Sequence, residues 1–202
     1  MLRRQFLIAA ALFPASAKAA LVATPRQTEG PFYPTSLPLD ADNDLLQVAG
    51  RTERAKGTVA HLFGRILNRE ERPVAGARVE IWQCDAEGRY HHPADRRGPA
   101  DPNFQGFGYA VTHDDGVYRF RTIRPVPYPG RTPHIHVAVL SPGRPRFVTQ
   151  MYVAGEPGNE RDGIYRSIRD PEARARVTVP LDPAPEIEPG SLRGQFDIVI
   201  DA

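Results

Sequence analysis

From residue 58 onward, the chain consists of short runs in which apolar and polar residues alternate. The clearest runs cover residues 58–67, 74–82, 117–123, 134–140, 147–153 and 195–200. Alternation with a period of two predicts strands that bury one face, because successive side chains of a strand point to opposite sides. The 21 prolines and 17 glycines favour short strands over long helices. We therefore predict an antiparallel β-sandwich over residues 58–202, with long loops and a short helix at about 162–168.

Residues 21–57 lack this periodicity and are rich in Pro, Asp, Asn and Thr. We expect them to form an extended N-terminal arm that packs over the sandwich. One segment of the arm, Thr28–Pro34, holds two aromatic residues between prolines. Anchoring the arm to the core would explain this segment by itself, so the sequence leaves any further role open.

The first 20 residues have the form of an export signal. Arg3 and Arg4 precede a short apolar run, and small residues follow up to Ala20. The run is too short to span a bilayer, and a frayed basic helix is the alternative. The arginines with Phe6 and Leu7 resemble the core of a twin-arginine signal, which implies export of a folded protein to the periplasm or beyond. No later segment is apolar enough to suggest stable membrane insertion.

Charge and cysteine content limit the possible partners. The formal net charge is +2, and the arginines are scattered along the chain, so we predict no nucleic-acid partner. Cys84 is the only cysteine, which excludes an intrachain disulfide. We expect it to be a small buried hydrophobic residue, and a reactive thiol or an intermolecular disulfide is the alternative.

The segment that most suggests chemistry is His134-Ile135-His136. Residues two apart on a strand share a face, so the two imidazoles can converge on one metal ion. In isolation, however, such a pair is more often a surface or core feature.

The loop ahead of this strand strengthens the prediction of a metal site. Residues 127–133 contain three prolines and a glycine, which make a stiff, bent loop that can hold Tyr128 and Arg131 over the histidine face. A tyrosine in such a loop is by itself commonly a packing residue. Hard ferric iron prefers anionic oxygen, and a bound cation lowers the pKa of tyrosine from about 10. No carboxylate lies within a few residues of the histidines, so tyrosines are the candidate oxygen ligands.

Several separate segments now resemble one known family, the intradiol ring-cleavage dioxygenases, and within it the catalytic chain of protocatechuate 3,4-dioxygenase most. The matching segments share their order and spacing with that family. They are residues 29–33, 73–83, 88–90, 101–104, 116–125, 127–129, 131, 134–136 and 149–152.

The resemblance implies one non-haem ferric ion per chain. The residues that match the family's ligands are Tyr90, Tyr128, His134 and His136. In this family a catechol-type substrate binds the iron through both oxygens, and the tyrosine that matches Tyr128 leaves the metal and takes up a substrate proton. Dioxygen then opens the ring between the two hydroxyl-bearing carbons, which gives a cis,cis-muconate-type diacid.

Two further residues match positions with a role in the reaction. Arg131 would stabilise carbanion character in the substrate through its fixed charge, with a surface salt bridge as the alternative. Gln150 would orient the substrate or a later intermediate. By the same comparison His91 and His92 are not ligands, and we expect His61 and His113 at the surface.

The chain also departs from the family. Gly130 stands where the well-studied protocatechuate enzymes have an aromatic residue, which implies a wider or more open pocket. Neither their partner chain nor the helical dimerisation domain of catechol 1,2-dioxygenases has a counterpart here, and a homo-oligomer is possible. Two rival hypotheses remain. One is a non-enzymatic sandwich of the transthyretin-like or carbohydrate-binding kind, and the other is a ferrous extradiol or cupin-type oxygenase that uses Glu156 or Asp162.

Overall fold

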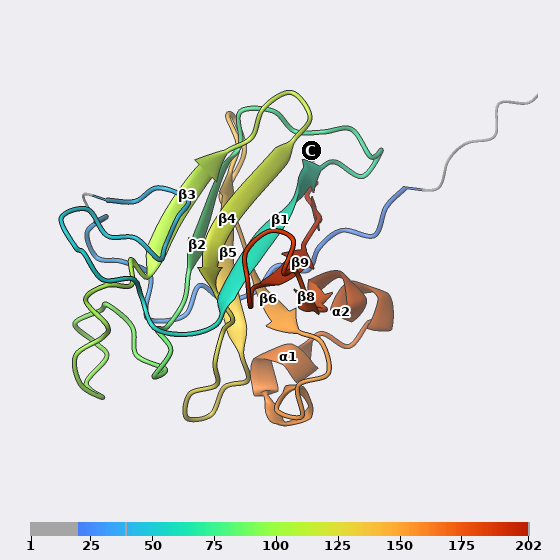
Figure 1. Cartoon of the computed structure of the whole chain (residues 1–202). Helices are drawn as coiled ribbons and strands as arrows, with labels where there is room; N and C mark the ends of the chain where they lie inside the picture. Colours follow the sequence, from blue (N-terminus) through green and yellow to red (C-terminus); the bar gives the residue numbers. More distant parts are fainter. Residues whose placement is uncertain (1–19, 39, 202) are drawn as a thin grey trace, which may run out of the picture.

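The computed structural model describes residues 20–38 and 40–201. All but the last residue of the predicted signal peptide lies outside these ranges. Two sheets pack face to face (Figure 1). The first sheet contains β1 (Val59–Leu67), β4 (Val117–Ile123), β8 (Asp182–Pro183), β9 (Leu192–Gln195) and β10 (Ile198–Val199). The second contains β2 (Arg78–Trp82), β3 (Phe107–Val111), β5 (His134–Leu140), β6 (Phe147–Val153) and β7 (Thr178–Val179).

The long strand pairs are antiparallel. In the first sheet β1 pairs with β4, and in the second sheet the order is β3-β2-β5-β6-β7. Three short pairings are parallel, namely β1 with β9, β1 with β10, and β6 with β7. The prediction of an all-β sandwich is confirmed.

The main hydrophobic core lies between the sheets. Leu62 and Phe120 face it from the first sheet, and Ile81 and Val137 face it from the second, all four of them buried. Burial of each such side chain contributes about 1.5–3 kcal/mol. These are the apolar members of the alternating runs, so the period of two locates the core correctly.

The outer face of the second sheet is buried as well. Trp82, His136 and Gln150 lie side by side across β2, β5 and β6, and each is at most 1% exposed. The N-terminal arm covers this face, because it hydrogen-bonds to β6 through Gln27 and to β2 through Tyr33 (Figure 1). The sheet therefore has polar side chains on a buried surface, which must find partners.

The expected elements differ from the observed ones in a few places. Residues 75 and 76 form a turn, and β2 begins at Arg78, later than predicted. β3 was not predicted, because Phe107–Val111 includes a glycine and shows little alternation. The predicted helix is present as α1 (Gly163–Ser167).

Two further helical elements, η1 (Asn159–Arg161) and α2 (Pro171–Val177), were not predicted. The start of α2 has an N-cap aspartate followed by proline, a recognisable signal. Within the described ranges, no helix has both the length and the apolar character needed to cross a bilayer.

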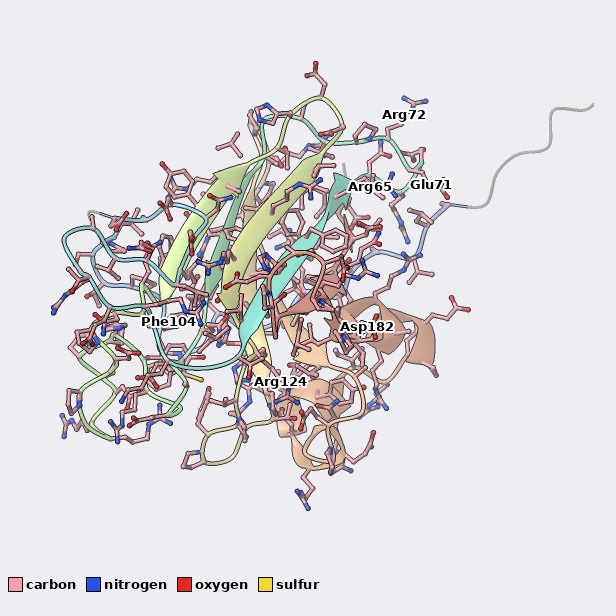
Figure 2. The ribbon with its side chains drawn as sticks, in the orientation of Figure 1. Arg65, Glu71, Arg72, Phe104, Arg124 and Asp182 are labelled. Carbon is pink, nitrogen blue, oxygen red and sulfur yellow. The ribbon has the colours of Figure 1, made fainter. Side chains whose placement is uncertain are left out.

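Loops at one end of the sandwich carry the two predicted tyrosine ligands, Tyr90 and Tyr128. Phe104 and Arg124 mark this end, whereas Arg65, Glu71 and Arg72 lie at the opposite end (Figure 2). Phe104 belongs to the long loop between β2 and β3, and Arg124 begins the loop between β4 and β5. These two connections therefore meet next to the histidine-bearing strand.

Cys84 is buried just after β2, and its thiol points at the carbonyl oxygen of Val126. Burial raises the pKa of the Cys84 thiol to about 12. We therefore expect no reaction with a thiol reagent at pH 8 in the native protein and one equivalent after denaturation. Rapid labelling of the folded protein, or a disulfide-linked dimer on a non-reducing gel, would contradict the structure.

Candidate metal centre

His134 and His136 lie on the outer face of β5 and point their rings at one another. Their Nε2 atoms are 3.2 Å apart. Two nitrogen ligands at ~2.1 Å from one ion, at a right angle, would lie about 3 Å apart. The Nδ1 atom of His134 donates to the carbonyl oxygen of Thr132 at 2.7 Å, so its Nε2 keeps a free lone pair.

Burial also keeps both imidazoles neutral. Burial, and then the charge of Arg131, lower the pKa of His134 to about 4. Burial and the neighbouring His134 hold the pKa of His136 well below its usual value. Neutral imidazole is the form that binds metals, so the strand presents two ligands ready for a cation.

Tyr128 is held over the histidines by a tight turn. Arg131 donates its backbone N–H to the carbonyl oxygen of Tyr128 at 2.9 Å, with Pro129 and Gly130 between them. Gly130 has a φ of 82°, as expected for the third residue of a type II turn after proline. The Tyr128 ring lies 5.4 Å from that of His134, and burial raises the pKa of its phenol while Arg131 partly offsets this.

Tyr90 approaches from the loop between β2 and β3. Asp95 accepts the backbone N–H of Tyr90 at 2.8 Å, which orients the residue. Gly88, two residues earlier, allows the two tyrosine loops to touch, since a Cβ there would lie 3.3 Å from Tyr128 Cβ. The Tyr90 ring is 5.8 Å from that of Tyr128 and 6.3 Å from that of His136.

The Tyr90 hydroxyl is buried and makes no hydrogen bond of normal geometry with any described residue, although the Tyr128 side chain lies close enough to affect its pKa. Burial raises the pKa of Tyr90 well above its ordinary value, and the nearby Tyr128 adds to this. A buried hydroxyl without a partner costs about 1–3 kcal/mol. A metal ion bound there would remove that cost and stabilise the phenolate, so the residue fits a ligand role.

Carboxylates are not part of this group. Asp162 accepts hydrogen bonds from Arg131 and Thr132, and Glu156 pairs with Arg124. Residues 20–38 and 40–201 contain no cluster of three His, Cys, Asp or Glu side chains suited to a metal. The rival ferrous site, which needs a carboxylate beside the histidines, therefore finds no support. Two phenols and two neutral imidazoles form a donor set that suits ferric iron.

Arg131 is fixed beside this group by a buried network. Its Nε donates to Asp162 at 2.8 Å, and its Nη2 donates to the side-chain oxygen of Gln150 at 2.6 Å. Although burial raises it, the hydrogen bonds from Arg131 and from backbone N–H groups hold the pKa of Asp162 below its usual value. Gln150 in turn donates to the backbone oxygen of Thr28 at 2.9 Å. The predicted pair Arg131 and Gln150 thus lies together, next to the candidate ligands.

Sequence reasoning missed several residues around the site. Phe32 stacks on Tyr90 with ring centroids 4.5 Å apart, and Trp82 stacks on His136 at 4.9 Å. Asp162 was considered only as a rival ligand, although an aspartate ahead of the predicted helix signals an N-cap. The arm motif was the only sequence signal for Phe32.

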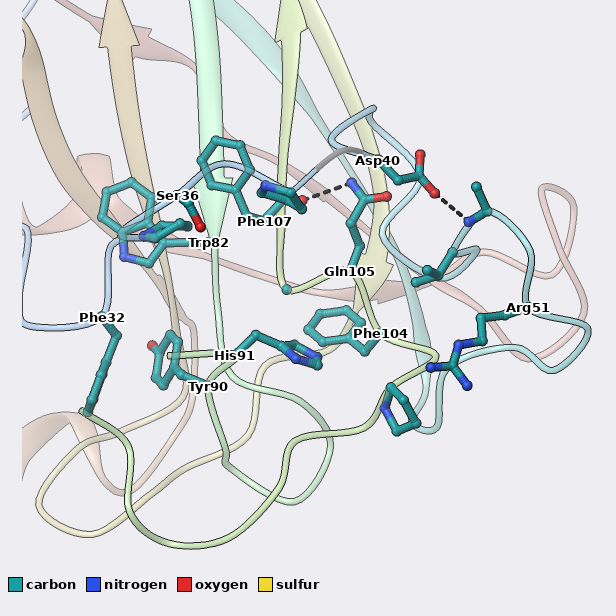
Figure 3. A pocket seen from close by; sticks show the side chains of 16 residues that line it. Phe32, Ser36, Asp40, Arg51, Trp82, Tyr90, His91, Phe104, Gln105 and Phe107 are labelled. Atoms are coloured by element: carbon teal, nitrogen blue, oxygen red, sulfur yellow. Dashed lines mark hydrogen bonds between the residues drawn. The ribbon is translucent and has the colours of Figure 1, made fainter. Parts of the chain in front are cut away.

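Two cavities border the site. A cavity of about 620 Å³ lies beneath the arm, with Phe32, Trp82 and Tyr90 at one end and Arg51 at the other (Figure 3). A cavity of about 400 Å³ borders Tyr128 and Gly130. A Cβ placed on Gly130 would meet nothing within 4 Å, in accord with the expected open pocket.

The remaining histidines lie outside the ligand group. His91 and His113 are exposed, and His92 contacts the edge of the Phe32 ring at 5.8 Å. His61, expected at the surface, is half-buried and lies 3.5 Å from Glu188.

Comparison with known proteins agrees with the family that the sequence resembles. The profile of a family described as Dioxygenase matches residues 28–202. The protocatechuate 3,4-dioxygenase beta chain of Burkholderia cepacia is 37% identical over 169 residues, which cover 79% of this chain and 71% of that protein. The catechol 1,2-dioxygenase of Candida albicans is 32% identical over 155 residues, and the match covers 67% of this chain but only 49% of that enzyme.

A solved structure agrees over nearly its whole length. It is the dioxygenase domain of a dioxygenase carbohydrate-binding protein fusion from the cellulolytic bacterium Streptomyces sp. SirexAA-E, with 32% sequence identity and a TM-score of 0.69. The match covers 90% of this chain and 99% of that domain. Together with the match over residues 28–202, these likenesses show that the chain belongs to the intradiol ring-cleavage dioxygenase family.

Proposed function

We propose that the protein binds one ferric ion per chain and uses it to open a catechol-type ring with dioxygen, between the two hydroxyl-bearing carbons. The ligands would be Tyr90, Tyr128, His134 and His136. The observation that carries this proposal is the convergence of two neutral imidazoles, 3.2 Å apart, with the buried and unpartnered hydroxyl of Tyr90. A sandwich that binds no ligand at this place would gain nothing from this costly arrangement.

When bound, the ferric ion supplies a Lewis acid and electron sink for a substrate held through both its oxygens. The two tyrosines differ in how tightly their side chains are packed. Tyr90 is 4% exposed and is packed between Phe32 and Tyr128, so it would stay in place. Tyr128 is half-buried beside a cavity, so its phenolate oxygen, once deprotonated as a ligand, would be free to move and take the proton from a substrate hydroxyl. Both atoms of dioxygen enter the diacid product.

Arg131 and Gln150 would act on the substrate itself. The side chain of Arg131 is only 14% exposed, and its guanidinium is held on two sides, by Asp162 and by Gln150. A fixed positive charge in such a site stabilises negative charge that develops on the substrate ring. Gln150 is fully buried and offers a second polar contact in the same place.

The open surroundings of Gly130 favour a substituted catechol over catechol alone. The relatives act on protocatechuate, catechol and hydroxyquinol, as their names state. We expect activity on at least one of these, or on a larger 1,2-diol. We also propose that the protein is exported, on the basis of residues 1–20, and replacement of Arg3 and Arg4 by lysine should leave it in the cytoplasm.

The first prediction concerns the wild-type protein. Iron-loaded protein should absorb in the visible range because of tyrosinate bound to ferric iron, and it should convert a catechol to a ring-opened diacid. Mass spectrometry of the product formed under ¹⁸O₂ should show two labelled oxygen atoms. A colourless iron-replete protein, inert towards every diol tested, would instead favour a binding module.

The second prediction concerns the two tyrosines. We expect Tyr90→Phe and Tyr128→Phe each to lose the visible band in part, and to lower kcat/KM by about 100-fold or more, because each removes an anionic ligand. Tyr109→Phe, a half-buried tyrosine on β3, is the matched control and should change neither. Retained iron and full activity in both ligand variants would refute the tyrosinate site.

The third prediction concerns Asp162. Asp162→Asn keeps an oxygen that can cap α1 but weakens the ion pair with Arg131. We expect kcat to fall by about tenfold or more while the iron content stays the same. Asp170→Asn, which makes the same change at the exposed cap of α2 without touching Arg131, should leave kcat unchanged. Equal kcat in the two variants would exclude a positioning role for Asp162.

A further inference from the structure

Residues 27–33 of the N-terminal arm, here called the arm wall, lie directly against the candidate metal centre. A Cβ on Gly30 would lie 3.2 Å from Cε1 of His136, and Phe32 stacks on Tyr90 with an interplanar angle of 22°. Phe32 also meets the edge of the Tyr128 ring at 6.4 Å. The arm wall therefore touches three of the four candidate ligands, each from a different element of the fold.

The beginning of the arm wall holds Gln150. The side-chain oxygen of Gln27 accepts the backbone N–H of Gln150 at 3.0 Å, and the backbone oxygen of Thr28 accepts its side-chain N–H at 2.9 Å. Gln27 also donates to the hydroxyl of Tyr152 at 2.9 Å. Since Gln150 accepts from Arg131, the arm wall helps to orient the pair proposed to act on the substrate.

Two charged residues of the sandwich, Arg146 and Glu80, contact the end of the arm wall and are here called the clamp. Arg146, between β5 and β6, pairs with Glu29 and lies 3.6 Å from Glu80 on β2. Glu80 is only 3% exposed in its side chain and accepts the Tyr33 hydroxyl at 2.9 Å. The Arg146 guanidinium also lies 4.4 Å from the centre of the Tyr33 ring. The side chains of Arg146 and Glu29 are 31% and 37% exposed, so solvent partly screens their pair, and it is the buried carboxylate of Glu80 that would be left with less compensation if Arg146 were removed.

We propose that the arm wall is a built part of the active centre, and that Arg146 and Glu80 are positioning residues that act through it. By holding Gly30 against His136 and Phe32 against Tyr90, the clamp sets the orientation of two iron ligands. The catalytic consequence rests on the proposed function, whereas docking of the arm wall is a property of the iron-free protein. The alternative, that the segment anchors the arm and does nothing more, predicts no effect at the metal.

Gly30 tests this alternative directly. Gly30 and Gly50 both lie in the arm with a φ of 70° and 80°, so replacement by alanine strains the backbone equally. Only at Gly30 would the new methyl group press on an imidazole, because the space around Gly50 is open. We expect similar melting temperatures for Gly30→Ala and Gly50→Ala. Gly30→Ala should bind ferric iron at least tenfold more weakly, with a shifted visible band, whereas Gly50→Ala should bind as the wild type does.

If the two variants bind iron equally well, the arm wall does not position the ligands and the proposal is overturned. This outcome differs from failure of the proposed function, in which the wild-type protein itself would bind no ferric iron and open no ring.

The clamp can be tested without iron. Trp82 is the only tryptophan in the chain, and it contacts both Tyr33, at 5.0 Å, and His136. Arg146→Ala should shift the emission of Trp82 to longer wavelength and at least triple the rate of proteolysis within residues 27–33. Arg146→Lys should restore part of both. Arg144→Ala, in the same loop but bonded to the backbone oxygen of Asp201, is the control.

If Arg146→Ala does not fold, Tyr33→Phe removes only the hydroxyl that Glu80 accepts and gives a milder test. It should raise the rate of proteolysis and lower kcat more than it changes KM. Wild-type emission and proteolysis in these clamp variants would overturn the role of the clamp.

Discussion

The rest of the structure depends on the register of β2, β5 and β6, which brings Trp82, His136 and Gln150 into one row on the outer face of the second sheet. A shift of one residue would turn both histidines of β5 into the hydrophobic core and move its apolar side chains outward. The register is held by the opposite face, where Ile81 and Val137 fill the core. The same alternation that stabilises the sandwich therefore determines which residues can reach a metal.

Burial of this polar row gives the site its chemical character. The arm covers this row, burial keeps the imidazoles neutral, and the Tyr90 hydroxyl remains without a hydrogen-bond partner among the residues described. The unmade hydrogen bond of this hydroxyl costs about 1–3 kcal/mol in the protein without a ligand. A cation bound there, as proposed, would remove this cost, because it would use the lone pairs of the imidazoles and the oxygen of the phenol. Relief of the cost of burial would then contribute to the affinity for the metal.

How much of the site can be predicted from sequence depends on how far apart along the chain the residues in contact lie. The faces of β5 follow from alternation alone, and the turn at Tyr128 follows from Pro129 and Gly130. Tyr90 lies in a long irregular loop and was identified only through family resemblance. The contacts of Asp162 with Arg131 and of the arm wall with His136 join residues far apart in the chain, and no local pattern encodes them. β3 was missed for the same reason, since only its pairing with β2 makes it a strand.

The two sides of the candidate centre are built differently, and this difference bears on how such a site could change its substrate. On the arm side, Gly30 lies against the His136 ring and Phe32 stacks on Tyr90. Almost any substitution at these two positions would therefore also disturb a candidate ligand. On the other side, Gly130 borders an open cavity and touches no ligand closely. A side chain at that position could narrow the pocket without moving the metal. If the centre binds iron as proposed, substitutions at the Tyr128 turn are expected to change which ring is accepted, whereas the residues of the arm wall are expected to preserve the metal site.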